Sequence, residues 1–138
     1  FKANHIALNI VNVERNGNYD ACCVQKGGDL ARNETKVVLK AENAQTHINC
    51  AYLMNGWATI DNTTYVKHLS PHTFSDQLVK GVVGGNAKGV FQGKIHIAKD
   101  AIKVLPLRFN CLFSKIIHKL KVYIANFAIF IKTGANFI

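Results

Sequence analysis

The chain has 138 residues, of which 49% are hydrophobic and 18% are charged, and its formal net charge is +9. This apolar content can form the core of one domain and excludes a globally disordered chain. The longest apolar run, residues 122–131, is about half of the roughly 20 residues that a membrane-spanning helix needs, so we expect a short buried segment there and no membrane partner.

Short runs of alternating apolar and polar residues begin near the N-terminus and recur along the chain. Residues 5–10, HIALNI, place Ile6, Leu8 and Ile10 on one face of a predicted strand. Later runs are rich in Val, Thr, Ile and Tyr, which suit a pleated surface. The strand-like runs, in chain order, are residues 5–10, 35–40, 46–53, 63–69 and 94–99.

The run at residues 46–53, THINCAYL, contains one of four cysteines. Ile48, Cys50 and Tyr52 share a face, which predicts a buried structural thiol at Cys50 in preference to an iron or sulfide ligand. No C-x-x-C pair is present, and the adjacent cysteines of a strand point to opposite faces. We therefore expect a reducing compartment and mainly buried thiols. The four cysteines are Cys22, Cys23, Cys50 and Cys111.

Turn residues separate these runs, and no helical crossover of 10–15 residues lies between them. This spacing predicts an all-β fold, with sandwich, barrel and β-solenoid as the alternatives. Polar residues inside inward-facing runs favour a solenoid weakly, because stacked coils can pair such side chains, but no clean repeat period is visible. The turn signals are Asn16-Gly17-Asn18, Gly27-Gly28-Asp29, Asn55-Gly56, Asp61-Asn62, Ser70-Pro71 and Gly84-Gly85-Asn86.

Residues 67–82, KHLSPHTFSDQLVKGV, place two histidines four positions apart. A helical pair at this spacing can bind metal, but Pro71 disfavours helix at the preceding residue, and four residues of strand span about 13 Å. We expect His68 to end a strand, Pro71 to turn the chain and His72 to start the next run. The two imidazoles would then hydrogen-bond neighbouring coils, and a metal site at His68, His72 or Cys50 is the less favoured interpretation.

The stretch from Tyr65 to Ala101 resembles the SufB/SufD family of iron–sulfur cluster assembly proteins, the SufD branch in particular. The family pattern is D-H-x-x-P-H-x-x-S-x-Q-x-x-K-G-V, a glycine turn, and V-F-x-G-K-I, with Lys67 in place of the family Asp. Residues 27–34 and 52–64 also resemble this branch. The matching signature residues are His68, Pro71, His72, Ser75, Gln77, Lys80, Gly81, Val82, Val90, Phe91, Gly93, Lys94 and Ile95.

The resemblance implies a segment of a right-handed parallel β-helix that acts as a non-catalytic scaffold in the cytoplasm. It implies a SufB-like subunit and a SufC-like ATPase as partners, with the iron–sulfur cluster forming transiently on the full complex and no cofactor bound by this segment. The chain begins at Phe1 and its only methionine is Met54, so we expect a central piece of a longer protein.

The resemblance fades after Ile102, which divides the chain into a core segment, residues 1–101, and a divergent basic tail, residues 102–138. Residues 1–100 hold eleven Lys and Arg and all eight acids, whereas residues 101–138 hold six Lys and Arg and no acid. The family stretch K-C-x-H-G-A-T has only Gly134-Ala135 as a counterpart here. The tail is therefore interpreted as degenerate or frame-altered.

Two other function classes remain open. A basic nucleic-acid-binding β protein is the alternative, disfavoured because aromatic and basic residues are not interleaved as they are in single-strand binders. A carbohydrate-active β-helix enzyme is disfavoured because the eight acids are scattered and only Asp61 and Asp76 lie in the best-patterned region. No catalytic residues are predicted.

Overall fold

The computed structural model describes residues 3–101, with the backbone alone at Asp100, and the backbone of two further strands, 108–115 and 123–131. Almost every described residue lies in a strand or in the short turn between two strands. The strands are β1 (Asn4–Val13), β2 (Asn18–Lys26), β3 (Leu30–Leu39), β4 (Gln45–Met54), β5 (Thr59–His68), β6 (Phe74–Val83), β7 (Lys88–Ile97), β8 (Arg108–Lys115) and β9 (Tyr123–Ile131), with a 3₁₀ turn, η1 (Lys99–Ala101), after β7.

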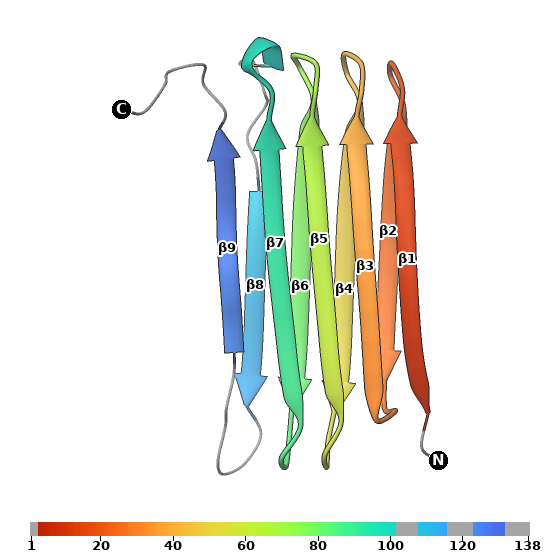
Figure 1. Cartoon of the computed structure of the whole chain (residues 1–138), viewed down its shortest axis with the longest axis vertical. Helices are drawn as coiled ribbons and strands as arrows, with labels where there is room; N and C mark the ends of the chain where they lie inside the picture. The colour runs from red at the N-terminus through yellow and green to blue at the C-terminus, as the bar shows by residue number, and fades with distance from the viewer. Residues whose placement is uncertain (1–2, 102–107, 116–122, 132–138) are drawn as a thin grey trace.

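Successive strands alternate between two parallel sheets. One sheet has the order β1-β3-β5-β7-β9 and the other has the order β2-β4-β6-β8. Figure 1 shows the chain rising through one sheet, falling through the other and advancing by one strand position with each coil, which is a right-handed path. The predicted all-β, right-handed parallel β-helix is confirmed.

The coils repeat at a nearly constant spacing that the sequence does not display. Leu30 pairs with Thr59 and Thr59 with Lys88, so these two coils advance by the same number of positions. The first coil is shorter, since Asn4 pairs with Leu30, and the β6–β8 coil is longer, since Asp76 pairs with Arg108. The length of a coil therefore varies along the chain. Equivalent positions of successive coils are buried alike but carry different residue types, so the repeat is not visible in a single sequence.

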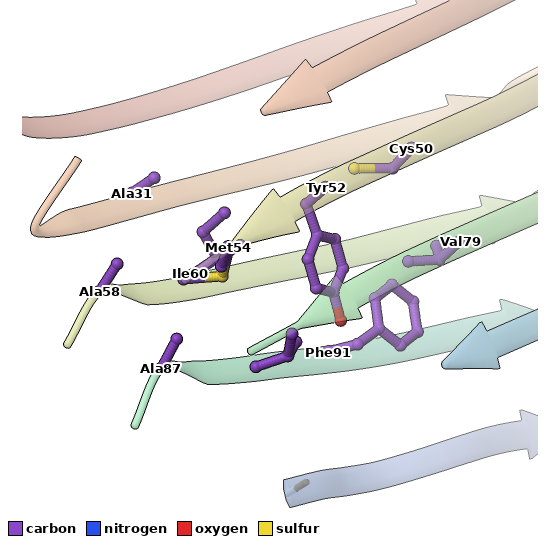
Figure 2. Packing of buried hydrophobic residues seen from close by; sticks show 10 residues of the cluster. Ala31, Cys50, Tyr52, Met54, Ala58, Ile60, Val79, Ala87 and Phe91 are labelled. Atoms are coloured by element: carbon purple, nitrogen blue, oxygen red, sulfur yellow. The ribbon is translucent and has the colours of Figure 1, made fainter. Parts of the chain in front are cut away.

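Alternation along each strand decides what lies inside. In β5 every second residue is buried, from Ile60 to His68, and the residues between them are half-buried. Figure 2 shows the result, with Tyr52 extending from β4 into the space between the sheets toward Phe91 of β7. The predicted shared face of Ile48, Cys50 and Tyr52 is buried, and in the strand-like run at residues 94–99 Ile95 and Ile97 are buried too.

β1 is the exception, because its apolar face is turned outward. Ile6, Leu8 and Ile10 are 72%, 55% and 65% exposed, although they share the single face that the sequence predicts. β1 pairs only with β3 among the described strands, so it forms an edge of its sheet. The outer face of this edge strand is therefore an exposed apolar row.

Two local predictions are wrong. Asp61-Asn62 is not a turn but lies within β5, where Asp61 faces outward 3.8 Å from Arg32 and Asn62 faces inward. His72 does not start a strand. It lies in the turn with a φ of 57°, and β6 begins two residues later at Phe74. The other turn signals do separate strands.

Two strands lie within the segment predicted to be a divergent tail. β8 pairs in parallel with β6, and β9 pairs in parallel with β7, so both sheets continue past residue 101. We expected residues 122–131 to be buried, but their side chains are not among those that the structure describes. Within the described parts of the chain, no helix is sufficiently long and apolar to span a bilayer.

Candidate functional site

The histidine motif at residues 67–82 spans the end of β5, a turn and β6. His68 is fully buried, and its ring nitrogens lie 2.8 Å from Thr73 Oγ1 and 3.1 Å from Ser75 Oγ. Burial lowers the pKa of His68 to about 4, so the ring is neutral at pH 7. His72 is exposed in the turn. The two imidazoles therefore lie in different environments. We expected His68 to hydrogen-bond a neighbouring coil, but its partners Thr73 and Ser75 belong to its own coil.

The rest of the family signature divides between the interior and the surface. Lys80 and Lys94 face solvent, and Lys94 Nζ lies 5.5 Å from the centre of the Tyr65 ring. Pro71 is half-buried in the turn. Of the remaining signature residues, Val82 and Val90 are half-buried on the outward faces of β6 and β7. The others lie on the inner faces and help to form the packed interior: Ser75, Gln77, Gly81, Phe91, Gly93 and Ile95.

Hydrogen-bonded amide and hydroxyl side chains cross the space between the two sheets. Thr64 Oγ1 on β5 donates to Gln77 Oε1 on β6 at 2.7 Å. Asn62 Nδ2 on the same strand donates to Gln25 Oε1 on β2 at 3.0 Å. The sequence predicts pairing of inward polar residues, but mainly between stacked coils. Here these two bonds run across the interior from sheet to sheet.

Stacked pairing of the predicted kind occurs nearer β1. Asn9 Nδ2 donates to Asn33 Oδ1 at 3.3 Å across neighbouring coils, and Asn33 Nδ2 in turn contacts Cys23 Sγ at 3.5 Å. Asn43 donates to Asn16 at 3.1 Å in the turns. Side-chain hydrogen bonds therefore join the β1 coil to the next coil, both along the strands and in the turns.

A cavity of about 720 Å³ opens into this interior beside β1 and β2. The inward side chains that line it include the thiols of Cys23 and Cys50 and the amides of Asn33 and Asn62. Burial, and then the neighbouring thiol of Cys23, raise the pKa of Cys50 to about 12. Cys50 is thus buried, as predicted, but it lies at the wall of a cavity.

Sequence reasoning did not find Cys23, Gln25 or Asn33 as partners of this site. Cys23 is the register partner of Cys50, one full coil later in the sequence. Gln25 contacts Asn62, and Asn33 contacts Cys23, from one sheet to the other. No local pattern marks such contacts. The only available signal was that inward positions of successive strands carry amides where a core would ordinarily carry aliphatic side chains.

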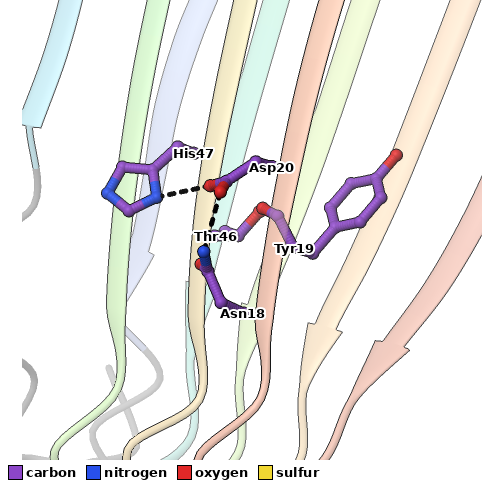
Figure 3. Close-up of polar contacts among 5 residues, drawn as sticks. All are labelled: Asn18, Tyr19, Asp20, Thr46 and His47. Carbon is purple, nitrogen blue, oxygen red and sulfur yellow. Dashed lines mark hydrogen bonds and ion pairs between the residues drawn. The ribbon is translucent and has the colours of Figure 1, made fainter.

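A second polar group lies on the outside of the four-stranded sheet (Figure 3). Asp20 accepts a hydrogen bond from Asn18 at 2.8 Å and lies 2.8 Å from His47 Nδ1. The His47 ring also packs against Phe74, with ring centroids 5.4 Å apart. The Asp20 side chain is 65% exposed and the His47 side chain is 36% exposed, so solvent screens their contact and it contributes modestly to stability.

Comparison with known proteins agrees with the motif and the fold. The family described as "SUF system FeS cluster assembly, SufBD core domain" matches residues 1–105. The iron–sulfur cluster assembly protein SufD of Escherichia coli strain K12 is 32% identical over 77 residues, which are 56% of this chain and 18% of that relative. No solved structure matches the chain. The chain belongs to the SufBD core domain family of the SUF iron–sulfur cluster assembly system.

Proposed function

We propose that this chain is a scaffold segment of a SUF complex, without catalytic residues of its own, that acts in the cytoplasm. It would contact a SufB-like subunit and a SufC-like ATPase, and that ATPase would supply the nucleotide site. The observation that carries the proposal is the match of residues 1–105 to the SufBD core. The likeness of 77 residues to a SufD protein supports the same assignment.

The placement of the signature residues supports a structural role. Gln77, Gly81 and Phe91 face inward and help to form the coil, while the signature lysines remain on its surface. A partner subunit would therefore meet outward side chains on a hydrogen-bonded sheet. Apolar examples that are exposed for such a contact are Val24, Leu53 and Trp57, which are 77%, 51% and 84% exposed.

We propose further that the iron–sulfur cluster is cargo of the assembled complex and is not a resident cofactor of this segment. Cluster ligands ordinarily come as sets of four thiolates. Among the described residues, no group of three or more His, Cys, Asp and Glu side chains is arranged to hold a metal ion. The partner subunits would then contribute ligands at the interface.

Co-expression of the tagged chain with a SufB-like and a SufC-like protein tests the proposal. We expect the wild-type chain to retain at least one of them through affinity purification. The matched control is Gly81→Arg, because a long side chain at this buried position cannot fit beneath Tyr52 and should break the coil. Retention of neither protein by the wild-type chain, or equal retention by the control, would contradict the proposal.

A further inference from the structure

Cys23 and Cys50 occupy the same inward row on neighbouring coils. Cys23 on β2 is the direct register partner of Cys50 on β4, and the next residue of the row is Val79 on β6. Both thiols line the 720 Å³ cavity, and both are free. Cys22, the preceding residue, faces solvent on the opposite side of β2. The fold therefore pairs two thiols that are separated by a full coil of the sequence.

The spacing of this pair suits a metal ion held between two sulfurs in a line. Neighbouring strands of a sheet lie about 4.8 Å apart, and side chains at matched positions extend side by side. Two metal–sulfur bonds of roughly 2.3 Å placed end to end span about 4.6 Å. A spacing of about 4.8 Å also lies within the Cα–Cα range of disulfides, but a disulfide would have to draw the two Cβ atoms together to about 3.8 Å.

The surroundings of the pair favour thiolates that are bound to a soft ion. Asn33 Nδ2 contacts Cys23 Sγ at 3.5 Å, so an amide N–H is placed to stabilise negative charge on that sulfur. A thiol that coordinates a metal ion loses its proton, so both sulfurs would bind as thiolates. The cavity provides the entry path to the otherwise buried side chain of Cys50.

We propose that Cys23 and Cys50 form a two-coordinate site for a soft monovalent metal ion of the Cu(I) class. Thiolates select Cu(I), whereas structural Zn(II) takes four ligands, and the described residues offer no third His, Cys, Asp or Glu at this place. On binding, both sulfurs coordinate as thiolates and their protons go to solvent. No electron is transferred. The inference is independent of the proposed scaffold function.

Anaerobic titration of the full 138-residue chain with Cu(I), in competition with bicinchoninate, tests the site. We expect one tight ion per chain, and X-ray absorption should show two sulfur neighbours and no nitrogen neighbour. Cys23→Ser and Cys50→Ser should each weaken binding by more than about 100-fold, since a lost ligand costs more than a lost outer contact. Asn33→Leu should weaken binding by roughly 10-fold.

Cys22→Ser is the matched control, because this neighbouring thiol is exposed on the opposite face of β2 from Cys23, and its loss should leave the affinity unchanged. Val79→Cys adds a third thiol to the row and should raise the sulfur coordination number from two to three. Circular dichroism of each variant verifies the β-structure, and only folded variants are compared. Equal affinity in Cys22→Ser, Cys23→Ser and Cys50→Ser, or no tight Cu(I) binding by the wild-type chain, would overturn the proposal.

Discussion

The phenol ring of Tyr52 on β4 fills the space that a side chain at Gly81 on β6 would occupy. The two residues are register partners on neighbouring coils, and a Cβ added at Gly81 would overlap the far end of the Tyr52 ring. Tyr52 is 3% exposed, so the ring is confined between the sheets. The glycine of the K-G-V signature is therefore explained by packing, not by a turn.

Gly81→Ala should destabilise the chain by about 1–3 kcal/mol, the usual cost of overpacking a closed interior. Urea denaturation measures the loss. Gly89→Ala should cost less, because an added Cβ there meets the Tyr52 hydroxyl at 3.0 Å without deep overlap. Combining Gly81→Ala with Tyr52→Ala removes the clash, and the double-mutant cycle should then show a coupling energy. Additive losses would mean that the two residues do not compete for space.

The bond between Thr64 and Gln77 gives a second prediction. Gln77 is 1% exposed, Thr64 donates to its Oε1, and its Nε2 has no hydrogen-bond partner among the described residues. Thr64→Val would leave the whole buried amide unpaired and should cost about 1–3 kcal/mol. Adding Gln77→Leu removes the orphaned amide, so the double variant should be more stable than Thr64→Val alone.

Thr63→Val, one residue away on the outward face of β5, is the control for Thr64→Val and should change the free energy of unfolding by less than about 0.5 kcal/mol. Chemical denaturation at a fixed pH compares all three variants. If Gln77→Leu made Thr64→Val worse, the buried amide would have to be satisfied by contacts other than Thr64.

Protonation of His68 should make stability depend on pH in a defined window. The pKa of His68 is lowered by burial from 6.5 to about 4 in the folded chain, so between these values the unfolded chain binds a proton that the folded chain does not. The stabilising contribution is complete above pH 6.5 and is lost as the pH falls toward 4. The free energy of unfolding should fall by up to about 3 kcal/mol across this window.

Urea denaturation at several pH values measures this slope. His68→Gln should flatten it, whatever its effect on stability at pH 7, while His72→Gln should leave it unchanged because His72 is exposed. His68 ends β5 and His72 lies in the turn that follows, four residues later in the same coil, so they form a matched pair. A slope that survives in His68→Gln would assign the effect to other titrating groups.

The sequence predicted the parts of this fold that depend on local alternation. The inward faces of residues 46–53 and 94–99 follow from period two, and the coil architecture followed from the family resemblance. Asp61-Asn62 was misjudged because its composition is typical of a turn, whereas the fold places Asn62 opposite Gln25 in the interior. The Cys23–Cys50 pair depends on the register between β2 and β4, and no short window of a single sequence contains both thiols.

His72 shows the limit of motif reading in another way. The sequence places a turn at Ser70-Pro71, which is correct, but the turn continues through His72 with a left-handed φ of 57°. Histidine adopts this conformation more readily than branched residues do. A metal site at His68 and His72 remains a prediction. Of these two side chains, only that of His68 lies inside the coil.

The apolar row on β1 gives the last prediction. β1 has one edge that pairs with no other described strand, and it also carries the exposed side chains of Ile6, Leu8 and Ile10. This combination promotes edge-to-edge association. Leu8→Lys should reduce the association of the chain measured by sedimentation equilibrium, because a lysine on an edge strand opposes further pairing. Thr63→Lys is the control. It adds the same charge in the same outward row, which runs from Leu8 through Glu34 to Thr63, but on a strand that is paired on both sides, so it should leave association unchanged. A wild-type chain that stays monomeric at high concentration, or equal effects of both lysines, would show that the β1 edge does not drive association.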